Sequence, residues 1–142
     1  MFVLKHQDGD IEFETKKGGF AEVDSKLYLS VETQVIGEDA FPDCYMFVLD
    51  GFPLDGSLEN SNIDISTNPN DEPPNVYVYT TFHACEVKAD LTIKVLSEDE
   101  ISVKLNVISE DVNYYNEKAK SNLFTGEVNL QRKAIGEMWI PS

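Results

Sequence analysis

Alternation of hydrophobic and polar residues dominates the pattern along the chain, and its clearest case lies in residues 87–107. In "EVKADLTIKVL" every second side chain from Val87 to Val95 is apolar, and in "ISVKLNVIS" the same holds from Ile101 to Val107. A period of two is typical of a β-strand with one buried face. Because the two runs flank the polar segment "SEDE", the pattern predicts a β-hairpin.

The register of this hairpin follows from its two apolar faces, which must point to the same side of the sheet. A slip of one residue would turn every core side chain outward. The register that avoids this gives three apolar pairs and two polar pairs: Val95–Ile101, Ile93–Val103, Leu91–Leu105, Lys94–Ser102 and Thr92–Lys104. It leaves residues 97–99 as a three-residue loop.

Six further segments show strand-like runs bounded by turn-forming residues. They lie at residues 10–15, 26–35, 44–50, 61–67, 75–83 and 122–131. The stretch "NVYVYTTF" at 75–82 is large or β-branched on both faces, so we expect a central strand that is covered on both sides. Helical periodicity is weak, and one short helix is expected near residues 111–120.

These elements predict a mainly β fold, either an antiparallel β-sheet sandwich or a strongly curved sheet, with at most one or two short helices. A chain of 142 residues is most simply one domain, so residues 1–142 are expected to share one core. The segment "STNPNDEPPN", residues 66–75, holds three prolines between strand-like runs. Because proline disfavours helix and ladder positions alike, we expect a long surface loop there.

Acidic residues far outnumber basic ones: 26 Asp and Glu stand against 11 Lys and Arg, which gives a formal net charge of −15. This balance argues against nucleic acid as a direct ligand, because phosphate binding requires Lys and Arg. It argues equally against anionic membrane surfaces. The partners that it favours are metal ions and basic proteins, while an acidic surface that only maintains solubility is the simpler interpretation.

The cellular compartment is indicated by the first residues and by the cysteines. The opening "MFVLKHQDGD" lacks the apolar core of a signal peptide, and no apolar run approaches the length of a membrane span. Cys44 and Cys85 are the two cysteines, which fits free thiols in a reducing compartment, with a single disulfide as the alternative. We therefore expect a cytoplasmic protein.

Candidate metal-binding and catalytic groups are sparse. His83 and Cys85 would share one face of a strand and Cys44 could approach them, but no fourth ligand follows with the spacing of a zinc site. The "DGD" at residues 8–10 does not continue into a calcium loop. The sequence has no nucleophile elbow, phosphate loop or zinc-protease motif. We therefore expect no enzymatic activity, no metal and no cofactor.

The most distinctive feature of the charge pattern is a long segment without cations. No Lys or Arg occurs between Lys26 and Lys88, and residues 1–75 hold sixteen acids and four lysines, against ten acids and seven bases in residues 76–142. If the strands of this segment lie together, they form a surface of one sign. Such a surface costs stability through self-repulsion, which a basic partner would relieve, and it speeds association with that partner.

The candidate contacts are the acids of this segment and two phenylalanines among them. We expect Glu38, Asp39, Asp43, Asp50, Asp55 and Glu59 as acidic contacts, with Phe41 and Phe52 as apolar anchors. The other aromatic residues, including Tyr77 and Tyr79, are mostly interpreted as core and sheet packing.

The segment "DVNYYNEKAKSNLFTGEVNL", residues 111–130, resembles bacterial immunity proteins of polymorphic or contact-dependent growth inhibition toxin systems, as do the small size, the acidity and the all-β pattern. The resemblance implies that the protein neutralises a cognate toxin domain by direct binding, without catalysis. A basic nuclease fits an acidic surface, because a nuclease presents Lys and Arg where it binds phosphates. The alternatives are a carbohydrate- or calcium-binding β-sandwich module, or a stand-alone protein whose acidity serves only solubility.

Overall fold

The computed structural model describes most of the chain, in segments that hold ten β-strands and one 3-10 helix. These segments are residues 1–6, 9–37, 43–55, 58, 62–67, 75–80, 83–84, 87–109 and 122–138. The elements are β1 (Phe2–His6), β2 (Gly9–Val23), β3 (Lys26–Val35), β4 (Cys44–Pro53), β5 (Ile63–Ser66), β6 (Val76–Tyr79), β7 (His83–Ala84), β8 (Lys88–Ser97), β9 (Glu100–Ser109), β10 (Asn122–Gln131) and the helix η1 (Ile135–Glu137).

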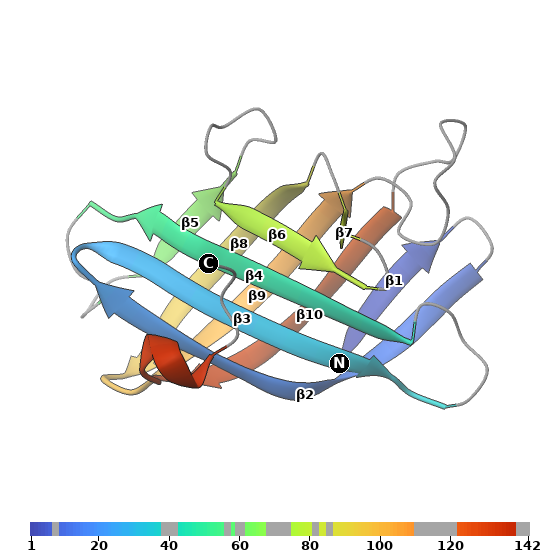
Figure 1. Cartoon of the computed structure of the whole chain (residues 1–142), viewed down its shortest axis with the longest axis horizontal. Coiled ribbons are helices and arrows are strands. Elements are labelled where there is room, and N and C mark those ends of the chain that lie inside the picture. The colour runs from blue at the N-terminus through green and yellow to red at the C-terminus, as the bar shows by residue number, and fades with distance from the viewer. Residues whose placement is uncertain are drawn as a thin grey trace.

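All ten strands belong to one sheet with the order β5-β8-β9-β10-β1-β2-β3-β4-β6-β7, in which every neighbouring pair is antiparallel. The sheet curls strongly, so that β2, β3, β4 and β6 cross in front of β5, β8, β9 and β10 (Figure 1). This half-barrel confirms the predicted mainly β fold in its form as a strongly curved sheet. No helix of the described residues is long and apolar enough to cross a membrane.

The hydrophobic core fills the space between the two layers of the curled sheet, and an aromatic cluster joins these layers. Phe124 on β10 stacks on Tyr45 of β4 and on Phe2 of β1, with ring centroids 3.8 Å and 5.0 Å apart. Phe13 of β2 meets Phe124 edge to face at 5.7 Å. All four rings are at most 1% exposed, so the curl of the sheet is held by a dry aromatic centre.

The predicted β8–β9 hairpin is confirmed in its register, since all three apolar pairs and both polar pairs form as expected. The turn differs from the prediction. Ser97 pairs with Glu100, and the register shifts between Val95 and Ser97. The connection is therefore a two-residue turn at Glu98 and Asp99. Ser97, which was predicted to lie in the loop, is paired, and Leu96 is the extra residue of a β-bulge.

The other strand predictions agree with the structure in part. β3 and β10 have the predicted bounds, while β2 and β4 extend beyond theirs and β5 is shorter. β1 had no counterpart in the prediction. The expected helix near residues 111–120 lies outside the described residues, as does most of the expected loop at 66–75, where Thr67 is buried and receives a hydrogen bond from the Ala89 N–H at 2.9 Å.

The segment predicted as a central strand is not central. β6 lies between β4 and the two-residue β7, near one end of the sheet. Val76 and Val78 are buried on its inner face, whereas Tyr77 and Tyr79 are half-buried on its outer face. The apolar character of both faces therefore reflects a partly covered outer surface, and it says nothing about the position of the strand in the sheet.

The first and last strands are neighbours, and β1 is much shorter than β2 and β10, which flank it. Phe2 pairs with Gly126 of β10, and a Cβ added to this glycine would lie only 2.3 Å from the Phe2 ring. Glycine at this position therefore lets β1 and β10 approach closely.

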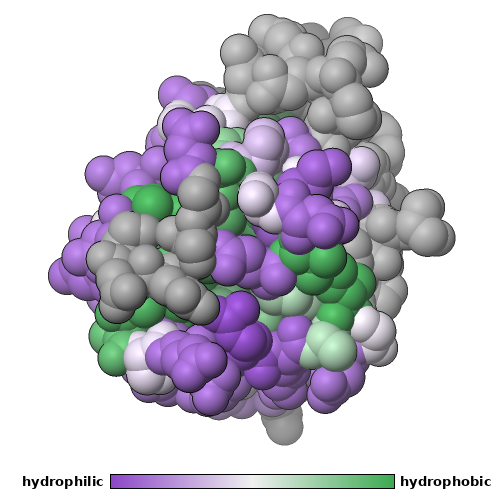
Figure 2. Space-filling view, turned by 90° about the vertical axis from the view of Figure 1, so that its left-hand side faces the viewer, coloured by the Kyte–Doolittle hydropathy of each residue, from purple (hydrophilic) through white to green (hydrophobic). Residues whose placement is uncertain are grey.

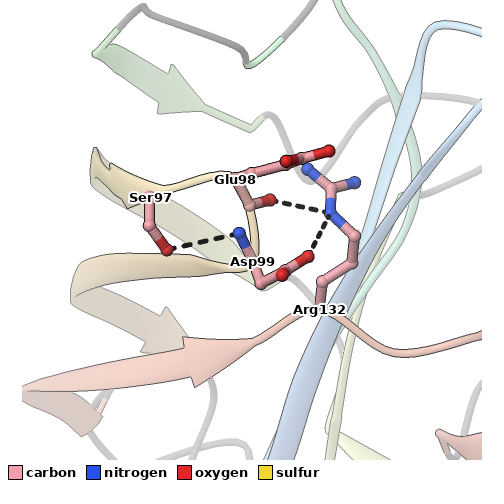
Figure 3. A network of polar contacts seen from close by, with 4 residues as sticks. All are labelled: Ser97, Glu98, Asp99 and Arg132. Atoms are coloured by element: carbon pink, nitrogen blue, oxygen red, sulfur yellow. Dashed lines mark hydrogen bonds and ion pairs between the residues drawn. The ribbon is translucent and has the colours of Figure 1, made fainter.

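Arg132 bridges the gap that the short β1 leaves between β2 and the end of β10. Its backbone forms an isolated parallel β-bridge with Phe20 of β2, and its guanidinium lies 4.9 Å from the centroid of the Phe20 ring. Its Nε donates a hydrogen bond to the Glu98 carbonyl at 2.9 Å and lies 3.9 Å from an Asp99 carboxylate oxygen (Figure 3). Arg132 thus ties the β8–β9 turn to β2 across the two layers.

Candidate protein-binding surface

The fold divides the cation-free segment between the two ends of the sheet. β3 beyond Lys26, β4, β6 and β7 lie side by side at one end, whereas β5 pairs with β8 at the other. There Asp64 of β5 shares the outer surface with lysines of β8 and β9. The acids of the segment therefore do not form one continuous surface, but those of β3 and β4 stay on neighbouring strands without Lys or Arg between them.

The outer surface of β3, β4 and β6 carries a group of half-buried side chains, which we call the tyrosine face. Its members are Glu32, Met46, Asp50, Tyr77 and Tyr79. They surround Val48, which is fully buried although it alternates with the core residues of β4 and points away from them. Tyr79 lies opposite Met46 and Tyr77 lies opposite Val48. Tyr and Met are enriched at protein interfaces relative to the rest of the protein surface.

Asp50 stands at one end of the tyrosine face in a partly dehydrated position. Its N–H donates to the Asn75 carbonyl at 2.7 Å, and the Asn75 side-chain amide donates to the Asp50 carbonyl at 3.2 Å, so β4 and the start of β6 are fixed together. Burial raises the pKa of the Asp50 carboxyl above its ordinary value. Burial also raises the pKa of Tyr79, with contributions from Tyr77 and from the charge of Asp50. The charge of the Asp50 carboxylate therefore acts on the Tyr79 hydroxyl.

A second acidic group lies at the other end of the face, around the exposed thiol of Cys44. Burial raises the pKa of this thiol, and so do the charges of Asp43 and Glu32, while Lys16 lowers it. On the neighbouring strands Gln34 donates to a Glu14 carboxylate oxygen at 2.9 Å. Lysines of β2 therefore border this end, and they leave the β4 and β6 part of the face without a cation.

A shallow depression separates the tyrosine face from the chain that follows β10. It is lined by Lys17, Glu32, Met46, Glu137 and Met138, among others. Met138 and Lys133 lie close over Gly19 of β2, where a Cβ would come 3.3 Å from the Met138 sulfur and 2.8 Å from the Lys133 Cδ. The absence of a side chain at this glycine lets the segment lie flat on β2.

The predicted contact residues are placed along the length of β4. Asp43 precedes the strand and Asp55 follows it, and both are exposed, while Asp50 lies between them. At about 3.3 Å per residue, Asp43 and Asp50 are separated by roughly 23 Å. Phe52 packs against the hydrophobic core from its partly buried position, so it points away from the tyrosine face. Glu38, Asp39, Phe41 and Glu59 lie outside the described residues.

Sequence reasoning missed the aromatic part of this surface. Met46, Tyr77 and Tyr79 were not among the candidate contacts, because aromatic residues in a strand are usually packing residues. The signal was present in "VYVY", where both faces of a strand are apolar. The structure shows that the tyrosines occupy the outer face, next to an acidic strand.

No group of three or more His, Cys, Asp or Glu side chains that could hold a metal ion occurs within the part of the chain that the structure describes. Cys44 is a free thiol, as predicted. Cys85 and the side chain of His83 lie outside the described positions, so the structure does not test the trio of soft ligands that they could form with Cys44.

The end of the half-barrel that carries the β2–β3 and β8–β9 turns has a different surface. Val23 and Leu96 are 41% and 50% exposed there. In Figure 2, which faces this end, hydrophobic side chains form separate patches between hydrophilic ones. Scattered exposed hydrophobic residues are ordinary on a solvated surface, so this end is a weaker candidate than the tyrosine face.

Comparisons with known proteins assign no relative, because no family model, curated protein or solved structure matches the chain. What the geometry defines is a curled antiparallel sheet with one half-buried outer surface that is aromatic and acidic.

Proposed function

We propose that this chain is an immunity protein that neutralises a cognate toxin domain, a basic nuclease, by direct binding through an acidic surface and without catalysis. The proposal places the protein in the bacterial cytoplasm, where such a toxin would reach nucleic acid. It joins the sequence resemblance to a surface that the fold assembles.

One observation carries this proposal: β3, β4 and β6 are adjacent in the sheet, so a cation-free stretch of sequence becomes a surface without cations. Glu32 and Asp50 stand on that surface, with Asp43 at its border. Three lysines of the second half of the chain lie on the opposite layer, Lys88 and Lys94 on β8 and Lys104 on β9. Among the described residues, β4 and β6 therefore bring acidic charge and no basic charge to this layer.

A surface of this kind suits rapid capture of a nuclease. Long-range attraction between an acidic and a basic surface raises association rates to about 10⁸–10⁹ M⁻¹s⁻¹ at low salt. Half-buried tyrosines then supply rigid contact area at a small cost in side-chain entropy, which slows dissociation. Occupation of the phosphate-binding site of the nuclease by carboxylates would exclude nucleic acid.

The experiment is capture of partners with the tagged full-length chain from its own source cells, followed by an activity assay on what is captured. We expect a basic protein that degrades nucleic acid and is inhibited by an equimolar amount of the chain, with binding that weakens as salt rises. A captured protein without toxic activity, or a nuclease whose activity the chain leaves unchanged, would contradict the proposal.

A further inference from the structure

We infer that the tyrosine face binds an arginine side chain of a basic partner protein, with the guanidinium between the Tyr77–Tyr79 pair and the Asp50 carboxylate. The inference deepens the proposed function, because it names the surface and the chemical group that a toxin would present to it. It concerns residues that the sequence pattern assigned to packing, apart from Asp50.

The two tyrosines provide the aromatic part of this site. They are two residues apart on β6, so their rings lie on the same face of the sheet. Their centroids are 6.3 Å apart and their planes differ by 19°, which makes a nearly parallel pair. Both side chains remain partly exposed. A planar guanidinium stacks on such rings more favourably than an ammonium does, and it is attracted by their negative faces.

Asp50 provides the charge. It stands on β4 two residues beyond Val48, the residue that lies opposite Tyr77, and its backbone is held by hydrogen bonds to Asn75 at the start of β6. The carboxylate is therefore presented beside the tyrosine pair by two paired strands. Its partial dehydration makes a cationic partner more valuable than it would be for a fully hydrated carboxylate.

The described strands around the site supply no cation of their own to pair with Asp50. β4 and β6 contain no Lys or Arg, and β3 contains only Lys26, at its first residue. Lys17 of β2 lies opposite Glu32 of β3, and β2 is three strands away from β6. A partner with a projecting arginine supplies the complementary charge and covers Met46 with the apolar part of the same side chain.

The site is tested by NMR titration of the labelled full-length chain with acetyl-arginine methylamide at millimolar concentrations. We expect saturable shift changes at Tyr77, Tyr79 and Asp50. The citrulline analogue, which has the same shape without the charge, should produce none of them. The lysine analogue should bind more weakly than the arginine probe.

Three variants separate this site from general attraction to an acidic protein. Asp50→Asn is nearly isosteric and should weaken binding of the probe about fivefold, as expected for loss of one partly dehydrated charge contact. Asp64→Asn, which removes one exposed carboxylate of β5 far from the tyrosines, is the matched control and should leave the affinity unchanged. Tyr77→Leu should also weaken binding, while keeping an apolar side chain on the sheet.

Equal weakening by Asp50→Asn and Asp64→Asn would overturn the inference, as would shift changes spread over β8 and β9, equal binding of the citrulline analogue, or no saturable binding. Such results would leave the proposed immunity function open, because a toxin could dock elsewhere. Failure of the capture experiment with intact binding of the probe would reject the immunity function and keep the site.

Discussion

The two layers of the curled sheet expose very different outer surfaces. On β5, β8, β9 and β10 most outer residues are polar and carry charges of both signs, as in the row Asp64, Thr92, Lys104 and Glu127, and we call this surface the polar face. On β3, β4 and β6 the tyrosine face is half-buried, and Val48 at its centre is 0% exposed. Ile108, an outer residue of β9, is 45% exposed.

This difference shows what the hydrophobic pattern of a strand indicates about the solvent exposure of its outer face. The strict alternation of β8 and β9 occurs because one face meets water and the other meets the core. In "YMFVL" of β4 the apolar residues are consecutive, and the structure shows both faces of that strand at least partly covered. The consecutive apolar residues of β4 therefore coincide with a strand whose two faces are both covered at least in part, and the alternation in β8 and β9 coincides with a solvated outer face.

The largest expected effect comes from introducing a charge at matched outer positions of the two faces. Val48→Asp should destabilise the fold by about 3 kcal/mol or more, because it buries an unpaired carboxylate. Ile108→Asp should cost less than about 0.5 kcal/mol, because the side chain stays hydrated. Urea unfolding of both variants measures the difference. Similar losses in the two variants would mean that the two faces are equally solvated.

A smaller effect is expected at the residue that joins the two layers. Arg132→Gln removes the stacking on Phe20 and the hydrogen bond to Glu98, and it should cost about 1 kcal/mol. Lys94→Gln removes the same charge from the exposed polar face and serves as the control, with little expected change. Thermal and urea unfolding should separate the two. If the control loses as much stability, net charge and not the contact with β2 is responsible.

The smallest expected effect is a pH dependence of folding stability that arises from Asp50 on the tyrosine face. Burial raises the pKa of Asp50 in the folded chain, so protonation of this group favours folding. The stabilising contribution is complete below the ordinary value of 3.8 and is lost as the pH rises through the raised pKa. Asp50→Asn should therefore be more stable than the unsubstituted chain at neutral pH, and this advantage should disappear below pH 3.8.

The control for this pH effect is Asp64→Asn, which corrects for the general relief of repulsion in a chain of net charge −15. Urea midpoints of the three proteins across the acidic range give the comparison. An advantage of Asp50→Asn that equals that of Asp64→Asn at every pH would show that burial of Asp50 has no energetic consequence.

The sequence allowed prediction of the fold class and of the hairpin register, because a period of two assigns each residue of β8 and β9 to a face. It could not give the strand order. Ile63–Ser66 pairs with β8 across the whole width of the sheet from β4, and no local pattern encodes that distance. The bulge at Leu96 was equally invisible, since it arises from backbone twist at the turn.

Only the negative charge of the candidate site could be predicted from the sequence. The cation gap pointed to β3 and β4, and these strands are adjacent in the structure. Closeness in sequence did not become closeness in space, because Asp43, Asp50 and Asp55 are spread along a strand and Phe52 turns to the core. The tyrosines became part of the site only when the pairing of β6 with β4 placed them beside Asp50.

The pairing of β1 with β10 has a consequence for how the protein is made in the cell. During translation, β1 to β9 leave the ribosome before β10, which pairs with both β9 and β1, has been synthesised. Until then the nascent polypeptide carries open edges on β1 and β9, which are prone to associate with other chains. The time between the synthesis of β9 and that of β10 therefore sets how long these edges stay exposed to other chains.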